Sequence, residues 1–154
     1  MEQTLLILKP DTVQRGLIGE VISRIEQRGL RISGMKMMQI TSSLAAQHYA
    51  EHQGKSFYDP LIAFITSAPV VVMVVSGPQA IAIMRAMMGK TDAREAAPGT
   101  IRGDYGLSNR HNLIHGSDSP ESAQREIALF FKPGELYDYK RVIEPWIGPE
   151  EGSF

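Results

Sequence analysis

One histidine, His115, stands in a sequence context suited to phosphate chemistry. It lies in the segment NLIHGSDS (residues 112–119), after a short apolar pair and before a polar turn. Ser119, Pro120 and Glu121 then have the order of a helix start, with a capping hydroxyl, a proline in the first turn and an acidic side chain at the positive end of the helix dipole. Backbone N–H groups at such a start can bind an anion. The pattern predicts a histidine at the end of a short strand, beside an anion-binding turn.

A carboxylate, Glu126, follows His115 at a spacing that allows the two side chains to meet. Four extended residues carry the chain roughly 13 Å away from the histidine, and seven helical residues bring it back roughly 10 Å. A carboxylate bonded to one ring nitrogen fixes the tautomer and leaves the other nitrogen as a nucleophile. The spacing predicts such a pair if the helix folds back on the strand. A surface histidine beside an ordinary turn fits the spacing equally well.

Two fragments end like a P-loop, GKS at 54–56 and GKT at 89–91. A P-loop also needs a glycine five residues before its second glycine, and those positions hold Tyr49 and Met84. Neither fragment directly follows a β-run. We therefore interpret neither as a nucleotide-binding loop of that class.

The segment from His48 to His52 matches the H-x-x-E-H pattern of some zinc enzymes, with Glu51 before the second histidine. A catalytic zinc site needs a third protein ligand and a supporting shell, and nothing nearby in the sequence supplies them. We interpret this segment as an exposed polar helix face.

Composition and charge limit the class of protein. With 154 residues the chain is expected to form a single domain, residues 1–154, with a sizeable core. Hydrophobic residues make up 43% and charged residues 21%, as in ordinary soluble globular proteins. The net charge of −1 argues against a general nucleic-acid or anionic-membrane binder, which usually carries a basic excess.

Cysteine usage and the first residues limit the class further. The absence of cysteine excludes disulfides, thiolate zinc sites and thiol catalysis. The start, MEQTLLILKPD, lacks the basic region and the long apolar run of a signal peptide or membrane helix. A cytoplasmic location is therefore expected, with no membrane partner.

Hydrophobic periodicity and capping residues predict four strands and several helices. The expected strands lie at 4–8, 30–40, 70–75 and around His115, and the expected helices lie at 17–28, from Ser42 or Ser43 to about Glu51, from Asp59 onward, at 78–88 and at 119–131. Residues 90–110 have no sustained period, and a loop of this length in a compact domain is either functional or disordered. The apolar run VVVMVV (70–75) is typical of a strand buried on both faces, which by itself favours an α/β protein with a parallel sheet.

The segment NLIHGSDS resembles the active-site signature of nucleoside diphosphate kinases, which pass a phosphate between nucleotides through a phosphohistidine. The similarity extends from Lys9 to about Phe131. It implies an α+β fold with a ferredoxin-like βαββαβ core, a four-stranded antiparallel sheet and helices packed on it. It also implies a homo-oligomer, either a hexamer or a tetramer, so that two-sided burial of residues 70–75 could come from a subunit interface.

The resemblance assigns the chemistry to five residues. His115 is implied to be the nucleophile and Glu126 the residue that orients its ring. Lys9, Arg85 and Arg102 fall where the family has its phosphate-binding lysine and arginines. Taken singly, each of these cations would be an ordinary solvated surface charge.

Further positions match the family's nucleotide contacts. Thr91 matches the hydroxyl donor to phosphate, Tyr49 the residue lying against the catalytic histidine, and Asn112 the residue that hydrogen-bonds the sugar hydroxyls. Phe57 falls where the family stacks the base, although the sequence alone favours core packing for it. Mg²⁺ is expected to be held mainly by the nucleotide phosphates, with Asp118 either helping through water or stabilising the turn.

The implied activity is transfer of the terminal phosphate of a nucleoside triphosphate, mainly ATP, to a nucleoside or deoxynucleoside diphosphate, with ping-pong kinetics. The alternative is a phosphohistidine carrier in a signalling relay, but such carriers are usually helical bundles and VVVMVV argues against one. Nucleic-acid binding is expected to be secondary at most. Residues 106–111 are more polar than the usual approach to the signature, with His111 expected to be exposed, and residues 146–154 have no assignment.

Overall fold

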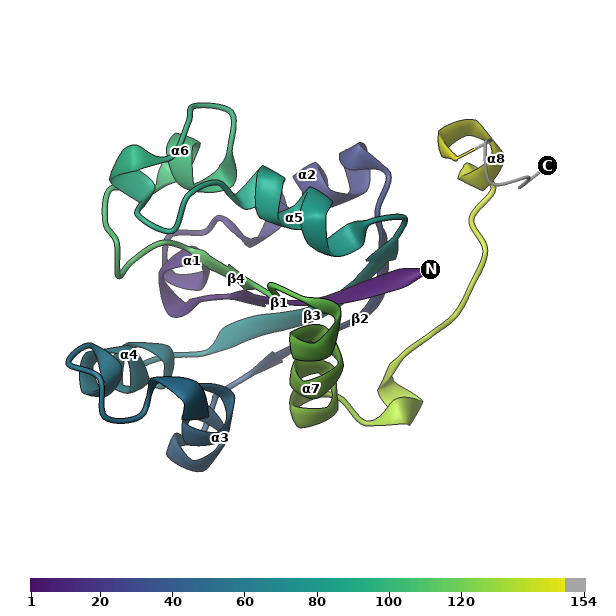
Figure 1. Cartoon of the computed structure of the whole chain (residues 1–154). Helices are drawn as coiled ribbons and strands as arrows, with labels where there is room; N and C mark the ends of the chain where they lie inside the picture. Colours follow the sequence, from purple (N-terminus) through teal and green to yellow (C-terminus); the bar gives the residue numbers. More distant parts are fainter. Residues whose placement is uncertain (149–154) are drawn as a thin grey trace.

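A four-stranded antiparallel sheet runs through the centre of the molecule (Figure 1). The structure, a computed structural model, describes residues 1–148. The strands are β1 (Glu2–Leu8), β2 (Arg31–Met38), β3 (Val70–Gly77) and β4 (Ile114–Gly116), in the spatial order β2-β3-β1-β4. β1 pairs antiparallel with β3 and β4, and β2 pairs antiparallel with β3. The ferredoxin-like sheet is confirmed, and the parallel sheet favoured by the apolar pattern is wrong.

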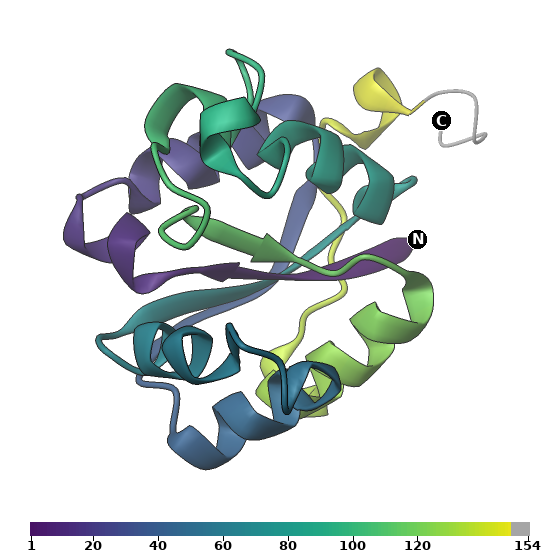
Figure 2. The same ribbon diagram turned by 60° about the vertical axis from the view of Figure 1, so that its left-hand side comes forward.

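Helices cover both faces of this sheet (Figure 1, Figure 2). One layer contains α2 (Ile18–Arg28), α5 (Ala80–Met88) and α6 (Ile101–Tyr105), and α1 (Pro10–Gln14) joins β1 to α2. The other layer contains α3 (Ser42–His48), α4 (Tyr58–Ile65) and α7 (Pro120–Phe130). The chain alternates between the layers, so residues distant in sequence meet at the ends of the strands.

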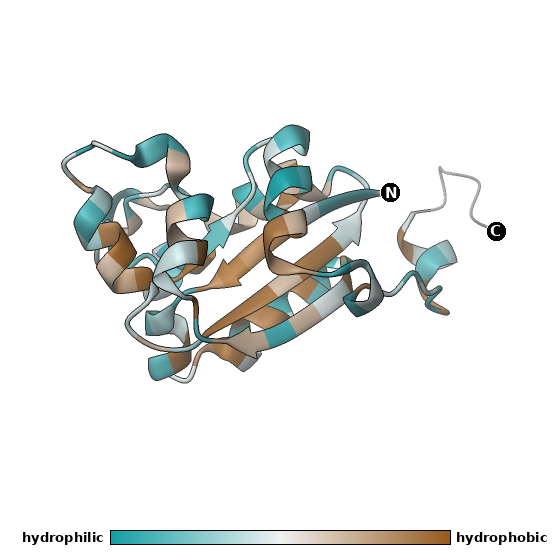
Figure 3. Ribbon diagram, turned by 90° about the horizontal axis from the view of Figure 1, so that it is seen from below, coloured by the Kyte–Doolittle hydropathy of each residue, from teal (hydrophilic) through white to brown (hydrophobic). Residues whose placement is uncertain are grey.

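The two central strands supply side chains to both layers. In β1, Leu6 and Leu8 join the core under α2 and α5, while Leu5 and Ile7 join the core under α3, α4 and α7. Figure 3 shows the apolar residues concentrated along the strands. Every residue of β3 is buried, and residues 70–75 alternate between the two cores in the same way. Burial of VVVMVV on both faces therefore arises within one chain, and no subunit interface is needed to explain it.

Helix boundaries follow local capping chemistry. Gly29 ends α2 with a φ of 102°, a left-handed conformation that glycine adopts without a steric cost. Ser119 caps α7 by accepting a 3.1 Å hydrogen bond from the Ser122 amide, as predicted. The cap of α3 is Thr41, which accepts from the Leu44 amide at 3.1 Å, so the prediction of Ser42 or Ser43 was wrong by one or two residues.

Residues 90–110 form an ordered segment rather than a structureless loop. They contain the 3₁₀ turn η2 (Ala93–Glu95) and the five-residue helix α6, whose cap Thr100 accepts a hydrogen bond from the Gly103 amide. Both elements are shorter than the window in which apolar periodicity can be detected. This explains why the sequence pattern missed them.

The chain after α7 returns along the edge strand β2. It passes through η3 (Pro133–Glu135) to the short helix α8 (Glu144–Ile147), and the Tyr137 amide donates to the Ser33 carbonyl at 2.8 Å. The rest of the unassigned tail, 149–154, lies outside the described residues. Among residues 1–148, no helix combines the length and apolar content needed to span a membrane.

Candidate active site

A cavity of about 760 Å³ lies where β1 ends and β4 begins, between the two helical layers. It is lined by all ten residues that are predicted from the sequence and the family resemblance to take part in catalysis or nucleotide binding: Lys9, Tyr49, Phe57, Arg85, Thr91, Arg102, Asn112, His115, Asp118 and Glu126. These side chains come from several separate stretches of the chain, from the end of β1 to α7. Their convergence is a property of the fold and could not be read from spacing alone.

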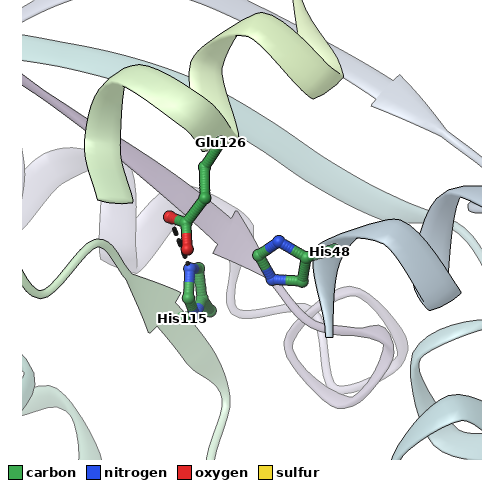
Figure 4. A group of neighbouring side chains, drawn as sticks. All are labelled: His48, His115 and Glu126. Carbon is green, nitrogen blue, oxygen red and sulfur yellow. Dashed lines mark hydrogen bonds and ion pairs between the residues drawn. The ribbon is translucent and has the colours of Figure 1, made fainter. Parts of the chain in front are cut away.

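The predicted pairing of His115 with Glu126 is present. β4 holds His115 opposite Ile7 of β1, and α7 packs back against β1. Glu126 Oε1 then lies 3.0 Å from His115 Nε2 (Figure 4). Because the ionised carboxylate accepts a hydrogen bond from Nε2–H, the lone pair of the neutral ring is on Nδ1.

The environment of Glu126 keeps its carboxylate ionised. The side chain is buried, and Ser117 Oγ donates a second hydrogen bond to Oε1 at 2.7 Å. Burial pushes the pKa of Glu126 upward, but the hydrogen bonds from His115 and Ser117 outweigh it and leave the pKa below its ordinary value. The histidine therefore keeps a charged acceptor on one side of its ring.

A buried cation lies at the end of β1. Lys9 is 7% exposed, and its Nζ donates to Asn112 Oδ1 at 2.7 Å. Burial, followed by the positive charge of Arg102, lowers the pKa of Lys9 to about 8. A negatively charged group that enters the cavity would therefore stabilise the protonated form of Lys9.

Arg102 ties three segments of the site together. Its Nε donates to the Asn112 carbonyl at 3.1 Å, Nη1 to the Gly89 carbonyl at 2.9 Å and Nη2 to the Ile114 carbonyl at 2.6 Å. Burial, followed by the nearby charge of Arg85, lowers the pKa of Arg102 to about 10. The second hydrogens on Nη1 and Nη2 remain for an anion in the cavity.

The backbone before His115 is bent into an unusual conformation. Leu113 has a φ of 74°, which residues other than glycine seldom adopt. Its amide donates to Asp11 Oδ2 at 3.0 Å, and its carbonyl accepts from Thr12 Oγ1 and from the Lys9 amide. Asn112 is fixed in turn, because its Nδ2 donates to the Thr91 carbonyl at 2.9 Å. Strain of this kind persists only where the surroundings determine the conformation.

The mouth of the cavity has an exposed aromatic ring. Phe57 is 46% exposed just before α4, with the Lys55 ammonium 5.7 Å from its ring centroid. Core packing, which the sequence alone favoured for Phe57, is therefore wrong. His111 is exposed, as expected, and packs edge-on against Phe64 with ring centroids 4.7 Å apart.

Comparison with known proteins identifies the family. The family model described as nucleoside diphosphate kinase matches residues 2–136. The nucleoside diphosphate kinase of Thermomicrobium roseum is 61% identical over 147 residues, covering 96% of this chain and 99% of that protein. The nucleoside diphosphate kinase of Staphylococcus epidermidis is 60% identical over the same length and coverage. The chain belongs to the nucleoside diphosphate kinase family.

Solved structures of the family agree with the fold. A halophilic nucleoside diphosphate kinase from Halobacterium salinarum, in complex with CDP, matches with a TM-score of 0.93 at 53% identity, covering 95% of this chain and 97% of that one. A family protein from Babesia bovis matches with a TM-score of 0.92 at 46% identity, covering 96% and 99%. The family consists of kinases that act on nucleotides and generally need a divalent cation. The phosphohistidine relay carrier is accordingly not favoured.

In this kinase His48 is buried, whereas its sequence pattern predicted an exposed position. The expected exposed helix face is wrong, because α3 ends at His48, Glu51 and His52 lie in the 3₁₀ turn η1 (Ala50–His52), and His48 is only 4% exposed. Its ring meets the His115 ring edge-on with the centroids 4.7 Å apart, and the Tyr49 ring packs against His48 with the centroids 4.5 Å apart. Burial, followed by the charge of His115, lowers the pKa of His48 to about 3, so its imidazole is neutral.

Ser117 is the other site residue without a predicted chemical role. Its Oγ donates to Glu126 and accepts from the Leu5 amide at 3.1 Å, and so it links the carboxylate to β1. In the sequence it looked like an ordinary turn residue. Its proximity to both partners depends on the register of β1 with β4, which local sequence does not fix.

Proposed function

We propose that this nucleoside diphosphate kinase carries the transferred phosphate on Nδ1 of His115. The observation that supports this most directly is the 3.0 Å contact between His115 Nε2 and the ionised Glu126, which leaves the lone pair on Nδ1 of a histidine that lines the cavity. The overall reaction moves the terminal phosphate of a nucleoside triphosphate, mainly ATP, to a nucleoside or deoxynucleoside diphosphate. It proceeds in two half-reactions with ping-pong kinetics.

In the first half-reaction the Nδ1 lone pair attacks the terminal phosphorus in line. A P–N bond forms, the bond from phosphorus to the bridging oxygen breaks, and the nucleoside diphosphate leaves with that electron pair. The ring becomes cationic as the bond forms, and Glu126 stabilises it through the Nε2 proton. In the second half-reaction a terminal oxygen of the acceptor diphosphate attacks the same phosphorus, and the P–N electron pair returns to His115.

Charge neutralisation supplies most of the remaining catalysis, since phosphoryl transfer needs little other covalent machinery. We assign this role to Lys9, Arg85 and Arg102, with the Thr91 hydroxyl as a further donor to the phosphates. Lys9 and Arg102 are buried and fixed by hydrogen bonds, so they need little reorganisation when phosphate arrives. Tyr49, also in the cavity wall, is assigned to the catalytic group through its contact with His48.

The mouth of the cavity is assigned to the nucleoside. Phe57 offers a ring face for the base, and stacking of about 1–3 kcal/mol accepts any base. Asn112 is assigned to the sugar hydroxyls. The relative from Halobacterium salinarum binds a pyrimidine diphosphate, and we propose that this chain likewise accepts purines and pyrimidines.

We assign Mg²⁺ as the divalent cation. Asp118 is an exposed carboxylate on the cavity, and its pKa is lowered, chiefly by a hydrogen bond with Ser122, so it is ionised at neutral pH. One carboxylate plus substrate phosphates is a donor set that Mg²⁺ commonly uses, and Asp118 would contribute through water. When bound, Mg²⁺ supplies further neutralisation of the phosphate charge.

The wider biology expected from the resemblance belongs to the same proposal. We infer one nucleoside diphosphate kinase domain over residues 1–154, assembled as a homo-oligomer in the cytoplasm. Size measurement in solution distinguishes a hexamer from a tetramer.

Brief incubation with terminally labelled ATP and Mg²⁺ tests the mechanism. The protein should take up acid-labile, alkali-stable label that maps to His115 and is removed by added GDP. The variant His115→Ala should take up none, whereas His111→Ala, which changes an exposed histidine of the same cavity, should keep it. Label on another residue, or nucleotide exchange retained by His115→Ala, would rule the mechanism out.

A further inference from the structure

Three metal-ligating side chains converge beside the proposed nucleophile. One ligand atom from each of His48, His115 and Glu126 lies within 4.8 Å of the others, and Figure 4 shows the side chains pointing toward one another from α3, β4 and α7. We propose that this cluster is an inhibitory binding site for a divalent transition-metal ion of the Zn²⁺ type. The inhibitory part rests on the proposed function of His115, whereas metal binding itself does not.

The donor set favours one class of ion. Two imidazoles and one carboxylate make up a ligand set that binds Zn²⁺ in enzymes while a fourth position stays open. Mg²⁺ prefers oxygen ligands in an octahedral arrangement, so it is poorly served by two imidazoles. The site would therefore separate Zn²⁺ from the Mg²⁺ that accompanies the nucleotide.

The buried ring of His48 gives independent support. Within residues 1–148, neither of its nitrogens has a hydrogen-bond partner, although the residue is only 4% exposed. Buried polar atoms without partners are uncommon because their lost hydration is not replaced. Figure 4 shows the edge of this ring directed toward the face of His115, and the two ring planes lie at 84°. A metal ion in this space would provide the missing partner for one nitrogen of His48.

The distances require only a small adjustment. Ligands about 2.1 Å from a tetrahedral metal lie about 3.4 Å from one another. His115 Nε2 and Glu126 Oε1 are already 3.0 Å apart. Any pair at the 4.8 Å limit must close by about 1.4 Å, and rotation of His48 breaks no hydrogen bond because its ring makes none among the described residues. All three residues line the cavity, so the fourth position is open to water.

Occupation of the cluster would stop the first half-reaction. A neutral imidazole has one lone pair. If Nε2 of His115 gives that lone pair to the metal, the ring proton moves to Nδ1. Nδ1 then cannot attack phosphorus, and Glu126 becomes a metal ligand instead of the acceptor for the Nε2 proton. Ser117 can still donate to Glu126, so the carboxylate keeps one of its anchors.

Binding is tested on the full chain without nucleotide, after treatment with a chelator. Co²⁺ should bind with one ion per chain, give the visible absorption of a tetrahedral site and be displaced by Zn²⁺. His48→Gln should weaken binding by more than about tenfold. The matched control is His52→Gln, which removes the other histidine of the H-x-x-E-H pattern in the same cavity and should leave binding unchanged.

A second measurement avoids any problem with folding of the variants. In ¹⁵N spectra of the unaltered protein, stoichiometric Zn²⁺ should shift the ring signals of His48 and His115 and leave those of His52 and His111 in place. Shifts confined to His52, or no binding at stoichiometric metal, would overturn the proposal.

Inhibition is tested by uptake of label from terminally labelled ATP. Zn²⁺ should block uptake in the unaltered protein and should need more than about tenfold higher concentration in His48→Gln. Zinc–nucleotide complexes form equally in both assays, so the difference reports the protein site. Normal uptake with no zinc binding would defeat only this inference. Zinc binding in a protein whose His115 never takes up label would defeat the proposed function, and the inhibitory part with it, and would leave metal binding at the cluster intact.

Discussion

The inner end of the cavity and its mouth are built in different ways. The inner end is lined by four buried residues, and each makes at least one hydrogen bond to another part of the site: Lys9, Arg102, Asn112 and Glu126. At the mouth, Phe57 is 46% and Leu107 is 87% exposed.

The difference matches the two tasks that the proposal gives to the cavity. Phosphoryl transfer depends on donors that are already in place when charge develops, because reorganisation in the transition state would raise the barrier. Base binding without selectivity needs only an exposed ring face. The inner end should therefore be sensitive to small changes in geometry, and the mouth should tolerate them.

Removing the carboxylate should have the largest effect on activity. Glu126→Ala takes away the group that fixes the tautomer of His115 and stabilises the cationic ring, so kcat should fall by about 10²–10⁴-fold. Steady-state exchange assays with mixed nucleotides measure this. Glu121→Ala, which removes an exposed carboxylate from the first turn of the same helix, is the control and should stay near the unaltered rate. Equal losses in both variants would show that α7, and not the pair, was affected.

The bracing role of Arg102 predicts a loss of stability. Arg102→Lys keeps one charge but cannot donate to the Asn112, Gly89 and Ile114 carbonyls together, because an ammonium lacks the planar fork. The free energy of unfolding should fall by about 2–4 kcal/mol, measured by denaturant titration. Arg94→Lys is the matched change at the mouth, where the side chain is 67% exposed and paired with Asp92, and it should change stability by less than about 0.5 kcal/mol.

Local chemistry made part of this molecule predictable. The cap at Ser119, the glycine end of α2 and the strand at 70–75 follow from residues close to one another in sequence, and all three are present. The pairing of His115 with Glu126 could also be predicted, because the two residues lie in a strand and a helix that follow each other in the sequence. The antiparallel order of the sheet came only from family resemblance.

The remaining features depend on contacts between distant segments. Burial of His48 requires the end of α3 to lie against β4 and α7, and the left-handed Leu113 is held by Asp11 and Thr12 from a segment about a hundred residues earlier. Arg102 reaches its three carbonyl acceptors from α6, a helix too short to leave a periodic pattern. Sequence spacing contains no information about such contacts.

The buried lysine predicts a pH dependence that separates activity from stability. The pKa of Lys9 is lowered from 10.5 to about 8. Above pH 8 the folded chain loses this proton while the unfolded chain keeps it up to about 10.5, so the contribution of Lys9 to stability rises with pH in that window. Nucleotide binding should weaken over the same range, with kcat/KM falling by up to about tenfold per pH unit.

Variants at both ends of the cavity show where this dependence originates. Lys9→Arg should remove the fall, because arginine stays charged throughout the range. Lys55→Gln, at the mouth, should leave it in place. A fall that is unchanged in Lys9→Arg would place its source outside the inner end of the cavity.

The smallest expected effect belongs to the mouth. Phe57→Ala removes a ring that is already 46% exposed, so the lost stacking should be near the lower limit, about 1 kcal/mol or about fivefold in kcat/KM. The loss should be similar for ATP, GTP, CTP and UTP, because stacking uses the ring face and not the base edges. Thermal unfolding should be nearly unchanged, since little apolar area leaves the core. A loss confined to one base would mean that the mouth reads base edges, and the contrast between an inner end sensitive to geometry and a tolerant mouth would then be wrong.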